Sequence, residues 1–577
     1  MVLTRLRVVR ALTDPFVFTG FGLALLAVVI SWHGAATRGL EYDEIWTLRR
    51  YARKGAAWEI FQDLAVPNNH PLHSLLVAVA VGQSAGPELR VRLPSLLAMT
   101  TLVVVLPLFY YRVTRDREIA LLAGAWCASS APLLHFAQAA RGYELQTLLV
   151  LLFAFLVYHA NQHVGSEGWS LAGAVVAGIA AELTLPTSIL YLTPLAAYDL
   201  VSRWVRRRAR TMEGGKSWAA GDGKALAAYA ILAVFVIAWL GYGAEQLAAG
   251  RATFGASIGS LTEWLSFSGD VWAQLFGWPV IVLIACGVLA AKRRVLAACL
   301  LGVLCFPLLA APLTRGGPPR VYVPMIPFGM LAAASGFVRL LDLLRDRWTT
   351  RARTAVIVVV ALVPLIQLPS ALARWTPTDW REVVPVLQQR LPADAYINYP
   401  ATAGYVIGYY FGPRIRREVS QRVPCGARFT LVQVGGDAGI SALDPQRFSS
   451  LAIPVTTESS AELRDLVGAP LATYQADEVV SNEPAPGAAE TGICFAAIGP
   501  APLETVREIL GALCATDEPR RWGVLNGLLS DVLAPPPSPQ STVAVLLAAK
   551  DPKLTRSEMQ QMSAKHHNNI RFYALHR

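Results

Sequence analysis

Residues 15–32 read PFVFTGFGLALLAVVISW, an apolar run that follows a basic stretch at the start of the chain. A helix needs about twenty apolar residues to cross the hydrocarbon core of a bilayer. Runs of this kind recur through most of the chain, which has 577 residues, 54% of them hydrophobic and 16% charged. The sequence therefore predicts an α-helical polytopic membrane bundle. No small-residue cleavage site follows residue 32, so we expect a retained first span and not a signal peptide.

Apolar runs recur as far as residue 370, and with the first they give about 11–12 hydrophobic segments for a membrane domain of residues 1–374. The later runs cover residues 71–86, 93–111, 118–136, 144–160, 169–185, 187–202, 224–243, 271–291, 295–313, 321–341 and 354–370.

Basic residues outnumber acidic ones, 51 to 40, which gives a net charge of +11. The excess lies in short clusters between apolar runs, as expected for loops on the cytoplasmic side, and it does not indicate nucleic-acid binding. The clusters are Arg112–Arg117, Arg203–Arg210, Lys292–Arg294 and Arg345–Arg353. We therefore expect a multi-pass protein of the cytoplasmic (inner or plasma) membrane with a cytoplasmic N-terminus. The first loop, residues 35–70, is then extracytoplasmic.

The run at residues 71–86 breaks this alternation. If Asp43 lies outside and Arg112 inside, an odd number of crossings must separate them, yet two apolar runs lie between them. Either the run at 71–86 is short, re-entrant or steeply tilted, or the arginines at 112–117 are an exception to the charge rule. The short segment is the preferred interpretation.

After residue 374 the sequence becomes ordinary in polarity, and residues 375–577 are predicted to form an extracytoplasmic α/β domain. Alternating short runs predict strands and longer periodic patterns predict helices. The strand-like runs are Phe429–Val434, Thr542–Leu547 and Ile570–Leu575, and the helix-like patterns are Val383–Arg390 and Pro502–Cys514.

The seven cysteines show no CxxC spacing, so no cysteine-based metal site is expected. Cysteines inside apolar runs are expected to act as small hydrophobic residues. These are Cys127, Cys286, Cys299 and Cys305. Cys425, Cys494 and Cys514 lie in the C-terminal region, where one disulfide can form if that region is extracytoplasmic, with one thiol left over.

Five short motifs follow one another along the apolar part of the chain. They are Tyr42-Asp43-Glu44, Asn69-His70-Pro71-Leu72-His73, Arg92-Leu93-Pro94-Ser95, the segment from His135 to Tyr143 with Gln138 and Arg141, and Pro319-Arg320-Val321-Tyr322-Val323-Pro324. Their order resembles that of the C-type (GT-C) polytopic membrane glycosyltransferases. The similar branch is the family 39-like one that contains protein O-mannosyltransferases and the lipid A aminoarabinose transferase. The resemblance covers about residues 1–370.

This resemblance implies transfer of a sugar from a polyprenyl-phosphate-linked donor to a hydroxyl or amine on the outer face of the membrane. The acceptor can be a protein, a lipid or a polysaccharide. A lipid-linked donor also suits the chemistry, because nucleotide sugars are charged and are made in the cytoplasm. No glycine-rich phosphate loop is present at a strand-to-helix turn, so no nucleotide-binding module is expected.

Asp43 matches the loop aspartate of the family and is predicted to act as general base or to orient the acceptor. Glu44 is predicted to support it or to serve as a second metal ligand. The alternative is a solvated acidic pair neutralised by Arg49 and Arg50. The resemblance requires no cofactor with certainty; a divalent cation is allowed for, with Asp43, Glu44 and His70 as its ligands if there is any.

His70 stands where the aminoarabinose-transferase branch has a charged residue before two prolines, whereas this chain has His-Pro-Leu. Its role therefore stays open between donating to the phosphate, binding a divalent ion with Asp43, and capping the helix that follows. His73, one turn further on, is a weaker candidate for substrate binding.

Arg141 and Tyr143 lie in a short polar break between apolar runs, where an arginine needs water, an anion or a carboxylate. A guanidinium can pair with phosphate in a bidentate manner, and the alternative is an ion pair with Glu144 or with the first-loop carboxylates. Arg320 and Tyr322 are expected on the outer face with Arg315, against the charge bias. A lipid-linked phosphate is the preferred partner of these three, and lipid headgroups are the alternative.

Two further features carry weaker expectations. The loop at residues 244–268 is long enough to fold over a sugar, or it forms an interfacial helix that places Trp264 at headgroup level. Asp199 is close enough to Arg203 in sequence for a local ion pair.

Two other classes of function fit part of these features. A transporter or flippase for lipid-linked glycans would share the basic and aromatic residues but needs no outward acidic pair. A non-catalytic membrane-anchored protein would bind glycan through residues 375–577.

Overall fold

A computed structural model describes residues 15–52, 57–62, 69–82, 88–163, 167–212, 220–248, 258–289, 294–314, 316–344 and 349–375, together with 409–410 and seven strands. The chain divides into two compact units. One unit, the bundle, contains Met1–Arg38 and Trp46–Thr376. The other contains Gly39–Ile45 and Pro377–Arg577, and each unit is described by itself.

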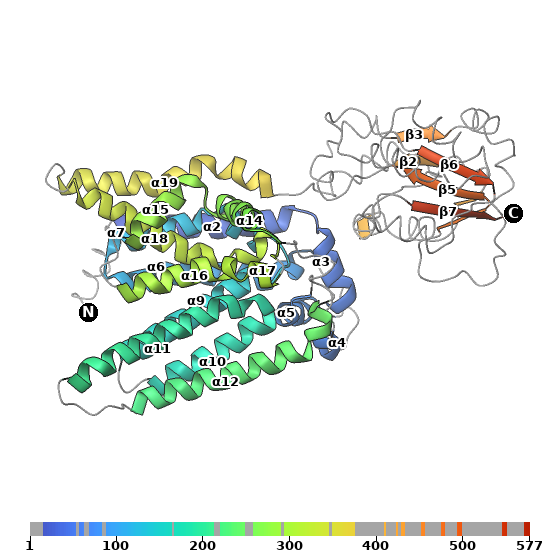
Figure 1. The fold of residues 1–577 in the computed structure, drawn as a ribbon. Coiled ribbons are helices and arrows are strands. Elements are labelled where there is room, and N and C mark those ends of the chain that lie inside the picture. Colours follow the sequence, from blue (N-terminus) through green and yellow to red (C-terminus); the bar gives the residue numbers. More distant parts are fainter. Residues whose placement is uncertain are drawn as a thin grey trace. The chain divides into compact units, whose positions relative to one another are not determined.

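The bundle is helical throughout the described residues (Figure 1). Its elements are α2 (Pro15–Thr37), η1 (Leu48–Ala52), α4 (Ala57–Gln62), α5 (Pro71–Val81), α6 (Glu88–Thr114), α7 (Arg117–Ala128), α8 (Ala131–Ala137), α9 (Tyr143–Gln162), α10 (Glu167–Thr184), η2 (Pro186–Ser188), α11 (Ile189–Met212), α12 (Ala220–Tyr242), α14 (Leu261–Leu275), α15 (Trp278–Leu289), α16 (Arg294–Leu309), α17 (Ala311–Thr314), η3 (Pro319–Tyr322), α18 (Met325–Asp342) and α19 (Thr350–Trp375).

Six described helices are long and apolar enough to cross a membrane: α2, α6, α9, α12, α18 and α19. The count becomes eight if the bent pairs α7–α8 and α14–α15 each form one span. The protein is thus a multi-pass membrane bundle, and 6–8 candidate spans replace the predicted 11–12 segments. Several apolar runs form helices that are short or bent.

Two runs predicted as single spans are wrong as continuous helices. The run at 118–136 forms α7 and α8, which meet at 54°, with Pro132 in the first turn of α8. The run at 271–291 belongs to α14 and α15, which meet at 99°. Gly277 lies at this bend with φ +74°, a left-handed conformation that glycine adopts readily and that ends a helix.

Helix α5 does not carry the chain across the membrane. Its 11 residues extend roughly 16 Å, about half of a hydrocarbon core. Near its start, His73 Nε2 lies 3.0 Å from Ser95 Oγ in α6, so the two helices meet near the beginnings of both. The crossing is made by the 27-residue α6, in agreement with the short segment predicted at 71–86.

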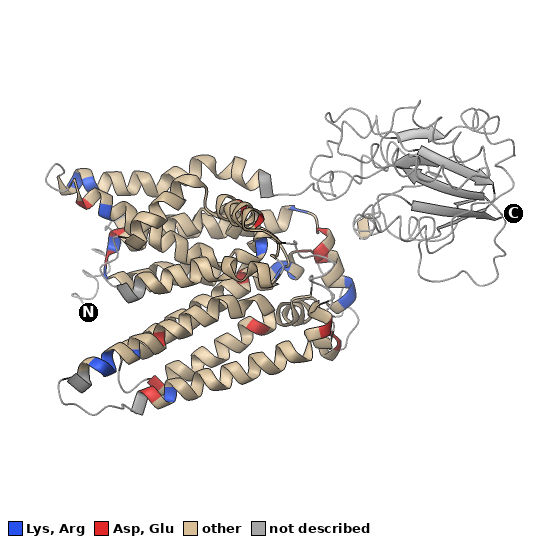
Figure 2. Ribbon diagram, in the orientation of Figure 1, with Lys and Arg blue, Asp and Glu red and all other residues tan. Residues whose placement is uncertain are grey.

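Helix α9 relates the two ends of the bundle. Its 20 residues extend about 30 Å, the thickness of a hydrocarbon core. Near its C-terminus, Tyr158 donates to the Arg112 carbonyl at 3.1 Å. At the same end, Arg353 of α19 pairs with Glu118 of α7 at 2.6 Å. Lys and Arg gather there, where α11 ends and where α7 and α19 begin (Figure 2), and we call this the basic end.

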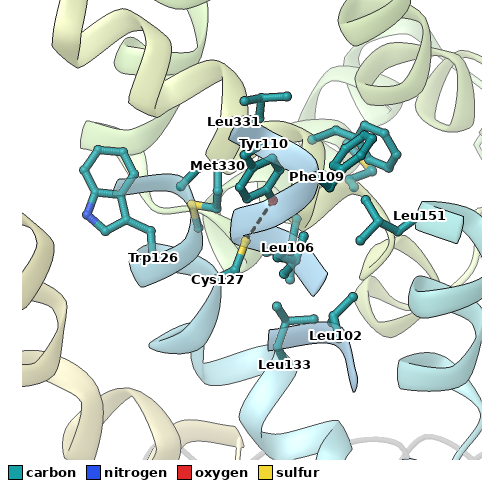
Figure 3. Packing of buried hydrophobic residues seen from close by; sticks show 14 of the residues in the cluster. Leu102, Leu106, Phe109, Tyr110, Trp126, Cys127, Leu133, Leu151, Met330 and Leu331 are labelled. Carbon is teal, nitrogen blue, oxygen red and sulfur yellow. Dashed lines mark hydrogen bonds between the residues drawn. The ribbon is translucent and has the colours of Figure 1, made fainter. Parts of the chain in front are cut away.

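The core between α6, α7 and α18 is apolar and contains one polar link. Tyr110 of α6 donates to the Pro327 carbonyl of α18 at 2.7 Å, and its hydroxyl lies 3.3 Å from the Cys127 sulfur of α7 (Figure 3). Interhelical hydrogen bonds of this kind contribute modestly in membranes. The cysteines of the apolar runs, Cys127 among them, carry free thiols and pack as predicted.

The second unit is described as strands: β1 (Val423–Pro424), β2 (Phe429–Val432), β3 (Ala452–Val455), β4 (Gln475–Glu478), β5 (Ile493–Ile498), β6 (Val545–Lys550) and β7 (Arg571–His576). A five-stranded antiparallel sheet has the order β1-β4-β7-β5-β6, and β2 pairs with β3. Strands β2, β6 and β7 overlap the predicted strand runs. The predicted helices and the side chains of Cys425, Cys494 and Cys514 lie outside the described residues.

Candidate functional site

Polar side chains from three parts of the bundle meet at the end opposite the basic end, around the start of α9. His70 and His73 come from the start of α5, Arg141 and Tyr143 from the start of α9, and Arg320 from η3. We call these five residues the site cluster. All of them are buried except Arg320, which is half-buried.

The two histidines hold one peptide group, the one that joins Arg141 to Gly142. The Gly142 N–H donates to His70 Nδ1 at 2.9 Å. The Arg141 carbonyl accepts from Ser95 Oγ at 2.9 Å, and Ser95 in turn contacts His73 Nε2 at 3.0 Å. Because a hydroxyl has one proton to donate, His73 is the donor to Ser95. Both ends of the peptide group are therefore fixed.

Tyr143 connects His70 to Arg141. Its ring meets the His70 ring edge to face, with centroids 5.0 Å apart. Its hydroxyl accepts from the Arg141 guanidinium at 3.3 Å, and the guanidinium carbon lies 5.6 Å from the ring centroid. This is a cation–π geometry, in which the face of the Tyr143 ring attracts the positive charge of Arg141. The contacts of Tyr143 therefore indicate that it positions His70 and Arg141. Its hydroxyl is already engaged by the Arg141 guanidinium.

Positive charge converges on His70. Burial lowers the pKa of His70 well below its usual value, and the charges of Arg141, His73 and Arg320 lower it further. Arg38, Arg92 and Arg320 also act electrostatically on His135, which lies in the same region. An environment of this kind disfavours bound cations and favours anions.

Arg92 and Gln138 belong to the quoted motifs, but the sequence assigned them no role. Arg92 is 1% exposed and donates to the carbonyls of Ala35 and Arg38 at 2.9 and 2.6 Å, at the C-terminal end of α2. A guanidinium there satisfies carbonyls that a helix leaves unpaired. Gln138 accepts from Arg38 at 3.1 Å. Both residues therefore attach α2 to the site.

One of the alternatives for Arg141, an ion pair with Glu144, is wrong. Glu144 is fully buried, and neither of its carboxylate oxygens has a hydrogen-bond partner among the described residues. The pair predicted between Asp199 and Arg203 is confirmed at 2.8 Å, and Tyr229 also donates to Asp199 at 2.8 Å. The spacing of four residues along one helix was sufficient to predict the pair of Asp199 and Arg203. A contact of Arg141 with Glu144 depends on how side chains point at the start of α9, which spacing does not determine.

Tyr322 lies in η3 beside Arg320 and packs its ring on Phe267, with centroids 6.0 Å apart. Burial raises the pKa of Tyr322 to about 12, and a hydrogen bond with the Gly317 backbone lowers it. The phenol therefore stays protonated at neutral pH and can donate but not act as a base. Arg315 lies outside the described residues.

Asp43 and Glu44 occupy the first turn of α3 (Tyr42–Thr47), and both belong to the second unit. Glu44 accepts from the Glu41 N–H at 2.8 Å and is buried, which differs from the alternative of a solvated pair. Asp43 is half-buried. Their roles as base and support stay predictions. Among the described residues no three His, Cys, Asp or Glu side chains gather as a metal site would require, and the divalent cation also stays a prediction.

The loop predicted at 244–268 is in part helical, because α14 begins at Leu261. Ser260 and Glu263 form a capping box at its start, so Glu263 has a local structural role. Trp264 donates to the Leu308 carbonyl at 2.8 Å. Residues 249–257, with Arg251, lie outside the described part of the chain.

Comparison with known proteins gives similarity in structure only. No family model matches the sequence, and no curated protein matches it. ArnT from Cupriavidus metallidurans in the apo state is similar with a TM-score of 0.45 and 15% identity, over 76% of this chain and 90% of that one. The same ArnT bound to undecaprenyl phosphate gives 0.42 and 14%, over the same shares.

The oligosaccharyltransferase of Archaeoglobus fulgidus in the apo form gives a TM-score of 0.39 and 12% identity, over 69% of this chain and 64% of that one. ArnT is a C-type aminoarabinose transferase, the branch that the motifs resemble. Similarity at this level says nothing about the reaction.

Proposed function

We propose that the protein transfers a sugar from a polyprenyl-phosphate-linked donor to an acceptor hydroxyl or amine at the membrane face that holds the site cluster. The observation that supports this most is the buried contact of the Arg141 guanidinium with Tyr143, whose ring packs on His70, with further positive charge from Arg320. Guanidinium groups in a poorly hydrated site bind phosphate strongly and can stabilise a departing phosphate. A carrier phosphate is the group that this arrangement suits.

The proposal places the site cluster outside and the basic end in the cytoplasm, because basic loops favour the cytoplasmic side. The length of α9 separates the two by one hydrocarbon core, so a donor bound at the cluster has its phosphate near one surface. Its isoprenoid tail then lies along the bundle in the bilayer. The second unit, with residues 377–577, is extracytoplasmic in this arrangement.

Asp43 acts as the base in this proposal, and Glu44 supports it. The acceptor loses a proton as its oxygen or nitrogen attacks the anomeric carbon, and the phosphate leaves as the carrier anion. Arg141, Arg320, Arg315, Tyr143 and Tyr322, with His73, bind or position the donor. A divalent cation at Asp43, Glu44 and His70 stays an alternative in this proposal, in which cationic side chains stabilise the phosphate.

The test is mass analysis of the purified protein incubated with candidate polyprenyl-phosphate sugars, with sugar-dependent release of free carrier as the expected product. Undecaprenyl phosphate, the lipid in one of the ArnT structures, is a reasonable first carrier. Asp43→Asn is expected to remove transfer with folding and membrane insertion unchanged. Glu59→Gln, an exposed acidic residue of α4, is the matched control and is expected to transfer normally.

Wild-type turnover in the Asp43 variant would remove this residue from the mechanism. Movement of the labelled lipid across the membrane without any chemical change would favour a transporter instead. Full activity of an isolated C-terminal region in glycan binding would favour the membrane-anchored binding protein.

A further inference from the structure

The backbone just before α3 is held by a residue from far along the chain. Gly39–Ile45 belongs to the second unit, together with Pro377–Arg577. Within that unit, the Leu40 N–H donates to the hydroxyl of Tyr410. Leu40 is buried, and a buried backbone N–H needs a partner within the protein. The contact therefore joins the first loop to the C-terminal region.

The next N–H along the chain has a local partner. The Glu41 N–H donates to Glu44 Oε2 at 2.8 Å. The Glu41 carbonyl accepts from the Ile45 N–H at 2.9 Å, which makes Glu41 the N-cap residue of α3. Glu44, at the third helical position, reaches back to the N-cap N–H as in a capping box. Its carboxylate therefore fixes the start of the helix.

Asp43 lies in the turn that these two hydrogen bonds fix. It is the second residue of α3 and follows Leu40 by three positions. Leu40, Glu44 and Ile45 are buried. Asp43 is half-buried, so its carboxylate keeps some exposure while its neighbours are enclosed. The turn thus combines a fixed backbone with one accessible acidic group.

Tyr410 is itself fixed by its neighbour. The rings of Tyr409 and Tyr410 meet edge to face, with centroids 5.0 Å apart and planes at 87°. Such an arrangement of two aromatic rings is favourable. A ring that is held in this way keeps its hydroxyl in one place, where the hydroxyl can fix a backbone group.

We propose that Tyr410 and Glu44 are positioning residues, which hold the N–H groups of Leu40 and Glu41 and thereby orient Asp43 for transfer. The inference rests on the transfer function proposed above. It gives the C-terminal region a task in the reaction, beyond any binding of glycan. The effect on rate can be large, because a displacement of about 1 Å at a reacting group can slow a reaction by about 100-fold.

Tyr410→Phe tests the contact with the C-terminal region. It removes the hydroxyl that accepts from Leu40 and keeps the ring that packs on Tyr409. Tyr158→Phe is the matched control. The Tyr158 hydroxyl also bonds to the backbone, at the Arg112 carbonyl 3.1 Å away, but it lies at the basic end.

A second pair of variants tests Glu44. Glu44→Gln removes the charge but keeps an oxygen that can accept from the Glu41 N–H. Glu44→Ala removes both. A positioning role requires only the acceptor, whereas a metal ligand or a reacting carboxylate requires the charge.

The experiment uses the full chain in phosphatidylcholine nanodiscs and makes three measurements. They are hydrogen–deuterium exchange of the Leu40 amide, turnover of an undecaprenyl-phosphate sugar, and the amount of undecaprenyl phosphate bound per protein. Tyr410→Phe is expected to exchange at Leu40 at least about threefold faster, the effect of one lost hydrogen bond. Its turnover number should fall at least about fivefold.

The KM for the donor and the amount of undecaprenyl phosphate bound should not change in Tyr410→Phe. A variant that was only less stable would lose bound phosphate together with turnover. Tyr158→Phe is expected to equal wild type in all three measurements. Glu44→Gln should keep turnover at least about fivefold above that of Glu44→Ala.

Wild-type turnover in Tyr410→Phe would overturn the role of Tyr410 and leave the transfer function standing, as would turnover and bound phosphate that fall in parallel. Equal losses in Glu44→Gln and Glu44→Ala would overturn the role of Glu44. A wild-type protein that releases no carrier would instead reject the transfer function. If Tyr410→Phe melts early, the wild-type protein decides: a protected Leu40 amide supports the contact, and exchange at the rate of an unstructured peptide overturns it.

Discussion

The arginines at the two ends of α9 have different surroundings. At the basic end, arginines meet carboxylates: Arg353 contacts Glu118 at 2.6 Å and Asp342 at 2.9 Å, and Arg203 contacts Asp199 at 2.8 Å. At the other end, Arg141 and Arg320 converge on a histidine whose outer nitrogen has no partner in the described structure.

Because of this difference, substitutions at the basic end are expected to affect stability, and substitutions in the site cluster are expected to affect ligand binding. Paired charges satisfy one another, so their loss should act on folding. Arg320 adds charge around a histidine that lacks one hydrogen bond, so its removal should act on ligand binding and should change stability little. The expected effects can be ranked on this basis.

The largest effect on stability is expected from Asp199→Asn. Asp199 is fully buried and contacts Arg203 and Tyr229, so the substitution removes a carboxylate from a buried guanidinium. Breaking such a pair is unfavourable by about 3–5 kcal/mol. Thermal denaturation in detergent should show a clear loss, whereas undecaprenyl phosphate affinity at low temperature should not change. A normal melting temperature would mean that water replaces the lost contact.

Removal of one guanidinium from the site cluster should give the largest loss of activity. Arg320→Gln is expected to reduce turnover by about 100-fold, as is typical when a group that stabilises developing charge is deleted. Arg353→Gln removes the same charge at the basic end and should change turnover by less than about twofold. Equal losses in the two variants would contradict the division between the ends.

A smaller loss is expected from Gly142→Ala. A Cβ atom at this position would lie 2.6 Å from His70 Nδ1 and 2.8 Å from Thr184 Cγ2, so the imidazole must move. We expect turnover to fall by roughly 10-fold, the effect of one weakened hydrogen bond to a charged group. Gly168→Ala in α10 is the control, because nothing lies within 4 Å of its added Cβ. Its turnover should equal that of wild type.

The smallest effect concerns the dependence of stability on pH. The pKa of His70 is well below 6.5 in the folded protein, whereas an unfolded histidine titrates near 6.5. As pH falls below 6.5, the unfolded state binds a proton that the folded state does not, so stability decreases by up to about 1.4 kcal/mol per pH unit. His70→Asn should lose less stability between pH 7 and pH 5. Parallel melting curves in the two proteins would contradict the lowered pKa.

The sequence predicted the parts of this molecule that depend on local pattern. Long apolar runs such as those of α6, α9 and α19 became single helices, because hydrophobicity over twenty residues determines them. The short segment that became α5 followed from counting crossings against charge. The bend at Gly277 was missed, since glycine is common in membrane helices and only the fold decides where one takes a positive φ.

Within the site, residue types were easier to predict than contacts. Arg141 and Arg320 were chosen because charges in a membrane protein require partners, and His70 because of its place in a motif; the structure places all three in one region. Ser95 and Gly142 were quoted only as parts of motifs, because a hydroxyl and a backbone N–H acquire a role from long-range packing. A polar residue such as Ser95, about two turns into a long apolar helix, is the signal that would have indicated it.

The peptide group between Arg141 and Gly142 has a consequence for how this site can vary. His70 holds its nitrogen side, and His73 holds its oxygen side through Ser95. Rotation of that amide plane would disturb both histidines at once, so their contributions should be thermodynamically coupled and a double-mutant cycle should be non-additive. The two imidazoles are therefore expected to act as one coupled unit, in which a change at one alters the effect of a change at the other.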